Sequence, residues 1–250
     1  MKTRILLSGC SGKMGHAVSA LVEERDDCEI CAGIDLSSTG HEGYPVYSSI
    51  FDFPGEADVL IDFSHPSGLA SLLEYGKQHH LPLVLCTTGY SKEQTESVRA
   101  ASAEIPVFSS GNMSLGINLL IELSKKAAQV LGEGFDIEIV EMHHNQKIDA
   151  PSGTALMIAD AINQVREDSM QYVYDRHSQR KKREKKEIGL HSVRGGTIVG
   201  EHQVIFAGQS EVLTLSHSAQ SKELFAAGAV NAAVFMAGKG PGLYDMSHLI

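Results

Sequence analysis

The chain has 250 residues, a formal net charge of −10 at pH 7 and a hydrophobic content of 42%. This length predicts one or two domains whose core needs no disulfide bonds. The acidic balance excludes a protein that binds nucleic acid through overall positive charge, so no nucleic-acid partner is expected.

The sequence carries no targeting signal. No signal peptide follows the first residues, and no stretch approaches the ~20 apolar residues that a membrane span needs. Four cysteines are too few for a disulfide scaffold, which indicates a cytoplasmic chain with reduced thiols and no membrane partner. Cys28 and Cys31 match C-x-x-C at the start of a predicted strand, where plain packing is favoured over a redox or metal-binding role.

The first half alternates short apolar strands with helices, which is typical of a parallel sheet covered on both faces. Helices are expected through residues 17–22, from Pro66 onward and over 91–103. Strands are expected over residues 3–8, 29–34, 57–63, 81–86 and 105–108. The fold class predicted for this half is α/β, a Rossmann-type doubly wound parallel sheet.

From about residue 113 the order of elements becomes α+β, which predicts a second domain. We expect helices over 115–131, 152–165 and 224–237, and strands over 135–142, 188–193, 197–206 and 212–216. The last three strands resemble antiparallel strands, and Gly195-Gly196 predicts a hairpin turn between two of them. The second domain is therefore expected to contain a mostly antiparallel or mixed sheet.

One segment contradicts the acidic balance. Residues 176–186 hold seven of the 21 basic residues of the chain. Such a run can form a nucleic-acid patch, but this one has no interleaved aromatic side chains on which bases could stack. A solvated, mobile surface loop is the preferred interpretation.

A glycine-rich turn follows the first strand, with Gly9, Gly12 and Gly15 spaced as G-x-x-G-x-x-G. A helix that begins at such a turn offers free N–H groups and a partial positive charge to a pyrophosphate. Asp35 follows the second strand, twenty residues after Gly15, as expected for a carboxylate that binds the adenosine ribose. The alternative is a structural turn and a strand-ending aspartate.

The residues around Asp35 bear on the choice of cofactor. A carboxylate accepts hydrogen bonds from a ribose 2′-hydroxyl but repels a 2′-phosphate, and the following Leu36 supplies no cation. Lys13 could compensate for the missing positive charge. We therefore expect NADH or NADPH as the cofactor, with NADH slightly favoured.

Two further turns follow strands at the same edge of the predicted sheet. Ligands of such sheets lie outside the carboxyl ends of the strands, so both turns are expected to line the nicotinamide end of the cleft. Ordinary glycine-containing loops are the alternative. The first turn contains Cys86, Thr87, Thr88 and Gly89, and the second contains Ser110, Gly111, Asn112 and Met113.

The densest chemistry lies between residues 141 and 155. His143, His144 and Lys147 precede a helix that opens with Ser152-Gly153-Thr154. A helix N-terminus is a cradle for a carboxylate, and a histidine can donate a proton near pH 7. The cluster indicates a carboxylate-bearing substrate. No metal site is expected, because adjacent histidines of a strand point to opposite faces and no further ligand has a familiar spacing.

The run from Glu141 to Ala155, which reads EMHHNQKIDAPSGTA, resembles the signature of 4-hydroxy-tetrahydrodipicolinate reductases, the dihydrodipicolinate reductase family of lysine biosynthesis. Residues 9–15, 87–89, 112–116, 192–196 and 200–202 also resemble motifs of this family. The resemblance covers essentially the whole chain.

The resemblance implies a homotetramer and NAD(P)H-dependent reduction of 4-hydroxy-tetrahydrodipicolinate, a small dicarboxylate, to tetrahydrodipicolinate with loss of water. It implies a dinucleotide-binding domain over 1–112 plus 222–250, and a substrate-binding and tetramerisation domain over 113–221. His143 and Lys147 would be the catalytic residues. His144, Ser152, Gly153 and Thr154 would bind substrate, and Gly9, Cys10, Ser11, Gly12, Lys13, Met14, Asp35, Cys86, Thr87, Thr88, Ser110, Gly111, Asn112 and Met113 would bind the cofactor.

Two departures from the family pattern stand out. Some members have an arginine where this chain has Leu36, and the absence of that arginine weakens any NADPH preference. Some members have an aromatic residue in place of Met113.

Two alternative functions stay open. The first is another Rossmann oxidoreductase, although a semialdehyde dehydrogenase needs a cysteine in its second domain and all four cysteines precede residue 87. The second is a nucleotide sensor without activity, which would not need the histidine–lysine cluster.

Overall fold

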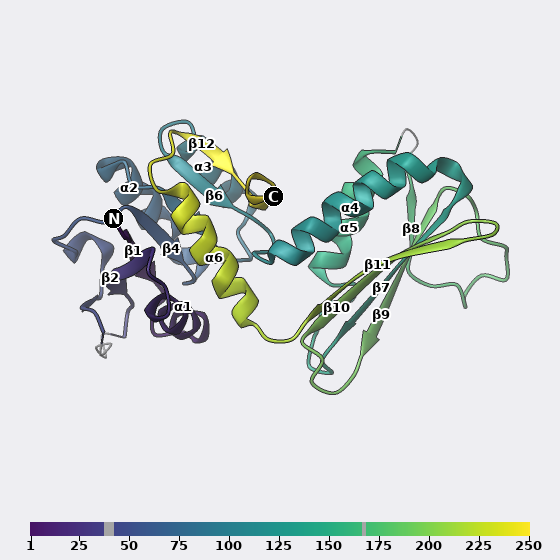
Figure 1. Ribbon diagram of the computed structural model, residues 1–250, viewed down its shortest axis with the longest axis horizontal. Helices are drawn as coiled ribbons and strands as arrows, with labels where there is room; N and C mark the ends of the chain where they lie inside the picture. Colours follow the sequence, from purple (N-terminus) through teal and green to yellow (C-terminus); the bar gives the residue numbers. More distant parts are fainter. Residues whose placement is uncertain (38–42, 167–168) are drawn as a thin grey trace. The chain divides into compact units, whose positions relative to one another are not determined.

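The computed structural model of the protein describes residues 1–37, 43–166 and 169–250. The chain divides into two compact units (Figure 1). Unit 1 comprises Met1–Leu115 and Glu223–Ile250, and unit 2 comprises Gly116–Lys222. Within the described residues, no helix is long and apolar enough to cross a bilayer.

Unit 1 is built on a seven-stranded sheet in the order β12-β6-β5-β4-β1-β2-β3, and every neighbouring pair is parallel. The strands are β1 Thr3–Ser8, β2 Cys28–Ile34, β3 Val46–Tyr47, β4 Val59–Asp62, β5 Leu83–Leu85, β6 Pro106–Ser109 and β12 Gly242–Tyr244. The helices are α1 Lys13–Glu23, α2 Leu69–His79, α3 Lys92–Ala101 and α6 Glu223–Met236, with 3₁₀ turns η1 Ile50–Asp52, η2 Pro66–Gly68 and η4 Met246–Leu249. The predicted Rossmann-type sheet is confirmed.

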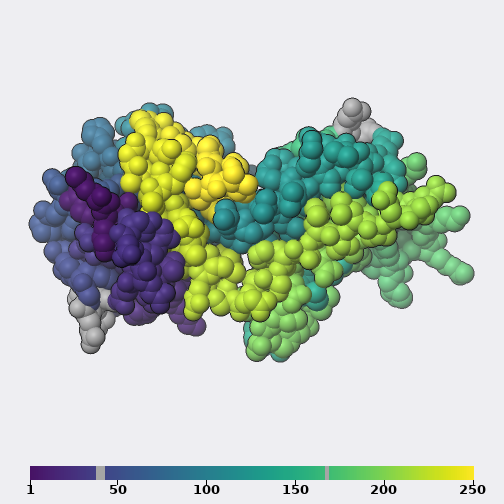
Figure 2. Space-filling view, in the orientation of Figure 1, coloured from purple at the N-terminus to yellow at the C-terminus, as the bar shows by residue number. Residues whose placement is uncertain are grey.

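The core of unit 1 lies on both faces of its sheet. Because successive side chains of a strand point to opposite faces, Ile5 and Leu7 pack with helices α1 and α6, whereas Leu6 packs with α2 and α3. This double burial explains the continuous apolar strands of the sequence. Figure 2 shows the C-terminal residues (yellow) beside the N-terminal ones (purple) on the surface of unit 1.

Helix α6 packs so closely on the chain before α4 that it needs a small residue at one position. A Cβ atom added at Gly228 would approach the carbonyl oxygen of Met113, far inside contact distance. Most of the other buried side chains of this helix, among them Ala226, Ala229 and Ala233, are also small.

Unit 2 is a mixed five-stranded sheet in the order β11-β10-β7-β9-β8. Strand β10 is antiparallel to β7 and β11, and β9 is parallel to β7 and β8. The strands are β7 Asp136–His143, β8 Gln171–Val173, β9 Glu187–Arg194, β10 Gly200–Ala207 and β11 Val212–Ala219; the helices are α4 Leu115–Leu131 and α5 Gly153–Gln164, with the 3₁₀ turn η3 Gly132–Gly134. Both helices pack on the sheet face that carries Ile137 and Ile139. The predicted mixed sheet is confirmed.

The predicted hairpin at Gly195-Gly196 is wrong. Strands β9 and β10 do not pair with each other, because β7 lies between them and hydrogen-bonds to both. The connection instead crosses the end of β7. The Gly195 N–H donates to the carbonyl of His143 at 2.9 Å, and the Asn145 N–H donates to the carbonyl of Gly196 at 3.2 Å.

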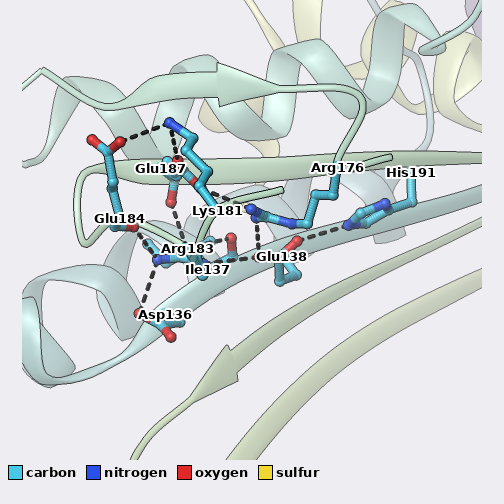
Figure 3. A network of polar contacts seen from close by, with 9 residues as sticks. All are labelled: Asp136, Ile137, Glu138, Arg176, Lys181, Arg183, Glu184, Glu187 and His191. Atoms are coloured by element: carbon cyan, nitrogen blue, oxygen red, sulfur yellow. Dashed lines mark hydrogen bonds and ion pairs between the residues drawn. The ribbon is translucent and has the colours of Figure 1, made fainter. Parts of the chain in front are cut away.

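The basic segment 176–186 lies at the surface between β8 and β9, but its cations are not simply solvated (Figure 3). Arg176 bonds Glu187 and Glu138, each at 2.8 Å. Arg183 bonds Asp136 and Glu138, each at 2.9 Å, and its side chain is only 16% exposed. The expectation of a freely solvated run is therefore corrected for these arginines, whose acidic partners lie on β7 or at the start of β9.

Candidate active site

The glycine turn after β1 has the backbone shape that a dinucleotide needs. Gly9 has φ +78°, and a Cβ atom there would lie 2.7 Å from the carbonyl oxygen of Phe63. A Cβ atom at Gly15 would lie 2.3 Å from the carbonyl oxygen of Cys10. Helix α1 then begins at Lys13, and its N-cap residue Gly12 places no side chain over the first N–H groups. The turn therefore fits an incoming pyrophosphate.

Asp35 lies directly beside the glycine turn, at the end of β2. Its carboxylate accepts the backbone N–H of Ser11 at 3.0 Å and both the N–H and hydroxyl of Ser37, at 3.1 and 2.9 Å. Partial burial opposes ionisation, but these hydrogen bonds prevail and hold the pKa of Asp35 below its usual range. An ionised carboxylate next to the phosphate turn fits a ribose hydroxyl.

The two later turns also lie at the carboxyl edge of the sheet, after β5 and β6. Buried Asp62, at the end of β4, holds the first of them, because it accepts the Thr87 hydroxyl at 2.7 Å and the Ser64 hydroxyl at 2.6 Å. The adjacent Cys86 thiol is buried, and burial raises its pKa, so it is not poised as a nucleophile. Thr88 and Gly89 are exposed at the tip of the turn.

In the second of these turns, Ser110 donates its hydroxyl to the carbonyl of Asn112 at 3.0 Å, and Asn112 accepts the N–H of Ser114 at 2.8 Å. Gly111 is exposed, whereas Met113 is 4% exposed and packs in the core of unit 1. The side chain of Cys10 is likewise buried in that core. For these two residues, any contact with a cofactor would come from the backbone.

Unit 2 contains an acid–base cluster centred on Glu141. This residue lies on β7 and has no exposed surface. One carboxylate oxygen accepts from Nδ1 of His143 at 2.6 Å and from Arg194 at 2.8 Å, and the other accepts from Arg194 at 2.7 Å and from the N–H of Ser152 at 3.1 Å. Burial opposes ionisation, yet the hydrogen bonds led by those from Arg194 lower the pKa of Glu141 to about 2.

His143 is held between Glu141 and the start of β10. A Cβ atom at Gly200 would lie 3.1 Å from Nε2 of His143, so the glycine leaves room for the ring. Burial lowers the pKa of His143 below its ordinary value, although the neighbouring carboxylate of Glu141 opposes the change. Such a histidine is largely neutral at pH 7 and can exchange a proton with a ligand.

Ser152 and His202 are the remaining members of this cluster and contact each other. Ser152 is the N-cap of α5 and accepts the N–H of Ala155 at 3.1 Å. Its hydroxyl lies 3.1 Å from Nε2 of His202, whose ring packs edge-on against His143 at 5.2 Å between centroids. Burial, reinforced by His143, lowers the pKa of His202 to about 4, so this imidazole is neutral at pH 7.

Lys147 and the first turn of α5 already hold a carboxylate of the protein itself. Nζ of Lys147 lies 2.8 Å from Oδ1 of Asp149, whose side chain is 58% exposed. The ion pair with Lys147 holds the pKa of Asp149 below its usual range, and the backbone N–H of Gly153 contributes to the same effect. Gly153 is exposed and Thr154 is half-buried at this helix start, and His144 is half-buried just after β7.

Sequence reasoning gave no role to three members of the cluster, Glu141, Arg194 and His202. A signal for the first existed, because Glu141 continues the buried alternation of Ile137 and Ile139 on β7. A buried acid at such a position requires a partner. The partner Arg194 was not predictable, since the pairing of β7 with β9 brings it there across more than forty residues.

No three His, Cys, Asp or Glu side chains among the described residues gather in a way that could hold a metal ion. Cys28 and Cys31 are free thiols on β2, and burial raises the pKa of both.

The fold and the two sets of site residues define a Rossmann-type oxidoreductase that uses a nicotinamide cofactor. The family models for the N-terminus and the C-terminus of dihydrodipicolinate reductase match residues 3–113 and 116–250. The chain belongs to the dihydrodipicolinate reductase family.

Individual relatives agree with this assignment. A 4-hydroxy-tetrahydrodipicolinate reductase of Caldanaerobacter subterraneus is 54% identical over 100% of this chain and 99% of its own length. The enzyme of that name from Clostridium tetani is 48% identical over 100% of this chain and 98% of its own. A dipicolinate-bound dihydrodipicolinate reductase from Paenisporosarcina sp. TG-14 superimposes with a TM-score of 0.83, at 25% identity and full coverage of both chains.

Proposed function

We propose that this enzyme reduces 4-hydroxy-tetrahydrodipicolinate to tetrahydrodipicolinate, with loss of water, in the diaminopimelate route to lysine. The names of the relatives support this activity. The observation that carries it is the placement of Asp149, whose carboxylate rests on Lys147 and is stabilised by the N–H at the start of α5. A site that already binds the carboxylate of a neighbouring side chain is suited to a dicarboxylate substrate.

The proposed roles follow from the geometry of unit 2. A substrate carboxylate would replace that of Asp149 on Lys147 and on the first turn of α5, near Gly153 and Thr154, with His144 as a further contact. His143, with Nδ1 bonded to Glu141, would exchange a proton through Nε2. Lys147 would stabilise the negative charge that develops on the substrate and supply a proton.

The nicotinamide, when bound, supplies the hydride. In unit 1 the glycine turn from Gly9 to Met14 would hold its pyrophosphate, and Asp35 would hold the adenosine ribose. Thr88 and the Ser110–Met113 turn would lie toward the nicotinamide, because both follow strands at the same sheet edge. The Asp35 carboxylate, followed by Leu36 rather than a cation, favours NADH slightly over NADPH.

A coupled assay tests this function. Freshly made product of dihydrodipicolinate synthase is mixed with the enzyme and NADH, and the loss of the near-ultraviolet absorbance of NADH is followed. Steady oxidation that depends on the synthase product is expected. No oxidation with NADH or NADPH would refute the proposal, and equal oxidation without the synthase product would point to another substrate.

A homotetramer is also proposed, assembled through unit 2. The sheet face that bears Ile137 and Ile139 is covered by helices, whereas the edge strand β11 leaves Val212 63% and Leu213 40% exposed. The unpaired backbone of an edge strand can pair with another chain, and these apolar side chains would lie beside such a contact. Light scattering coupled to size exclusion measures the mass directly, and a monomer at micromolar concentration would refute the assembly.

A further inference from the structure

The Glu141 carboxylate joins the two functional parts of the unit 2 cluster. One of its oxygens faces Nδ1 of His143, the proposed proton-exchanging group, and the other faces the N–H of Ser152, the cap of the helix that would bind substrate. Arg194 bonds both oxygens. A fully buried carboxylate is costly unless every part of it is paired, and here each oxygen has two donors.

We propose that Glu141 is a positioning residue that keeps the proton of neutral His143 on Nδ1, leaves Nε2 free for the substrate and fixes the start of α5, while Arg194 holds Glu141 in place. The catalytic part of this proposal rests on the proposed function. The tautomer of His143 is a property of the protein alone and can be tested without a substrate.

The geometry of Arg194 suits this part. Its guanidinium makes a two-pronged contact with Glu141 and also donates to the backbone carbonyls of Asp149 and Val193, at 2.7 and 2.8 Å. A planar fork of this kind fixes both the position and the rotation of a carboxylate, which a lysine cannot do. Arg194 thereby connects the end of β9 to the loop that carries Lys147.

The charges around His143 come from four segments. Glu141 lies on β7, Arg194 on β9, His202 on β10, and Lys147 in the loop after β7. The carboxylate alone would favour an imidazolium, but burial and the positive charges of Lys147 and Arg194 oppose it and leave the pKa of His143 below its ordinary value. Glu141 therefore orients the imidazole without keeping it permanently charged.

The chain contains a matched control on the same strand. Glu138 also accepts from a histidine, His191, at 2.7 Å and from two arginines, but it lies outside the cluster (Figure 3). Glu138→Gln thus removes a carboxylate with the same kinds of partner, three residues from Glu141. This variant therefore measures the effect on the protein of losing a hydrogen-bonded glutamate outside the cluster.

The first measurement is the ¹⁵N spectrum of histidine-labelled protein, with the His143 signals assigned from their loss in His143→Gln. The wild type is expected to show neutral His143 protonated on Nδ1. Glu141→Gln is expected to shift it toward the Nε2 tautomer and to lower its titration midpoint, whereas Glu138→Gln leaves both unchanged. A wild type with the proton on Nε2 would overturn the proposal even if Glu141→Gln does not fold.

The second measurement is the pH profile of turnover with the synthase product. Glu141→Gln is expected to lower kcat on the order of 10²-fold or more, as the wrong tautomer does in other acid–base sites. The acidic limb of the pH profile of Glu141→Gln should move with the titration midpoint of His143. The kcat of Glu138→Gln should stay within about twofold of the wild-type value. Glu141→Gln with wild-type tautomer, midpoint and profile would overturn the positioning role. An inactive wild type refutes the proposed function, and the spectra then still decide the role of Glu141.

Discussion

The hydroxyl of Ser152 lies within hydrogen-bond distance of Nε2 of His202, at 3.1 Å. The same hydroxyl oxygen accepts the N–H of Ala155 at 3.1 Å, which leaves its hydrogen available to the neutral imidazole. Protonation of His202 would remove this acceptor from a side chain that is only 4% exposed. The neutral ring is therefore part of the folded state.

The free energy of unfolding of unit 2 should consequently decrease as the pH is lowered. The pKa of His202 is about 4 in the folded state against ~6.5 in the unfolded chain, so between these values the unfolded state binds more protons. The free energy of unfolding should drop by about 3 kcal/mol from this group as the pH falls from 6.5 to 4. Urea unfolding at a fixed protein concentration measures it. His202→Gln should reduce the drop, and substitution of exposed His177 by Gln should not; equal slopes in all three would contradict the assignment.

Replacing His143 by glutamine should lower kcat by ~10²-fold or more, because the proposed proton exchange at Nε2 is lost while a polar side chain of similar length remains. Steady-state kinetics with the synthase product measures the effect. His191→Gln is the control, since His191 also faces a glutamate of β7 at 2.7 Å. An unchanged kcat would remove His143 from the chemistry.

Replacing Lys147 by alanine should raise the KM for substrate and lower kcat, because the ammonium is proposed both to bind a substrate carboxylate and to stabilise developing charge. Substitution of Lys125 by alanine removes a lysine from an ion pair of equal length, 2.8 Å, on α4 and should change neither constant. A Lys147→Ala variant with wild-type KM and kcat would exclude Lys147 from the site.

Asp35 should set the balance between the two nicotinamide cofactors. Wild-type enzyme is expected to have a lower KM for NADH than for NADPH, and Asp35→Ala should narrow or reverse the difference, because the carboxylate no longer repels a 2′-phosphate. Leu36→Arg should shift the ratio toward NADPH by adding a cation. A strong NADPH preference in the wild type would refute the role given to Asp35.

A methyl group at Gly9 should be more harmful than one at Gly238. Both glycines have nearly the same positive φ, +78° and +79°, but only Gly9 has backbone atoms within 3 Å of the added carbon. Gly238→Ala should cost about 1 kcal/mol and keep NADH binding, whereas Gly9→Ala should cost more and weaken NADH binding. Thermal unfolding and a fluorescence titration with NADH measure the two effects. Equal losses of stability and of NADH affinity in both variants would show that the close approach of Gly9 to Phe63 is unimportant.

The parts of the fold predicted from sequence are those that depend on local pattern. Strand β1, its glycine turn and Asp35 were predictable because an apolar run, a turn and a carboxylate follow each other within about one βαβ unit. The cluster at His143 and Lys147 was predictable as a group because its members lie close together in the chain.

The parts that were missed depend on partners far away in the sequence. Gly195-Gly196 has the composition of a hairpin turn, but the insertion of β7 between β9 and β10 is decided by a strand about fifty residues earlier. Glu141 and Arg194 are 53 residues apart in the sequence, and Glu138 and Arg183 are 45 apart. Strands β3, β8 and β12 have two or three residues each, too few to show a period.

The return of the chain to unit 1 through α6 imposes an order of completion during synthesis. Helix α6 contributes Val230 and Met236, among other side chains, to the core between β1, β4 and α1. The ribosome supplies this helix only after all of unit 2 has been made. The half that carries His143 can therefore fold while the chain is still growing, whereas the nucleotide half, although begun first, stays open along the α6 face until the helix that closes it emerges.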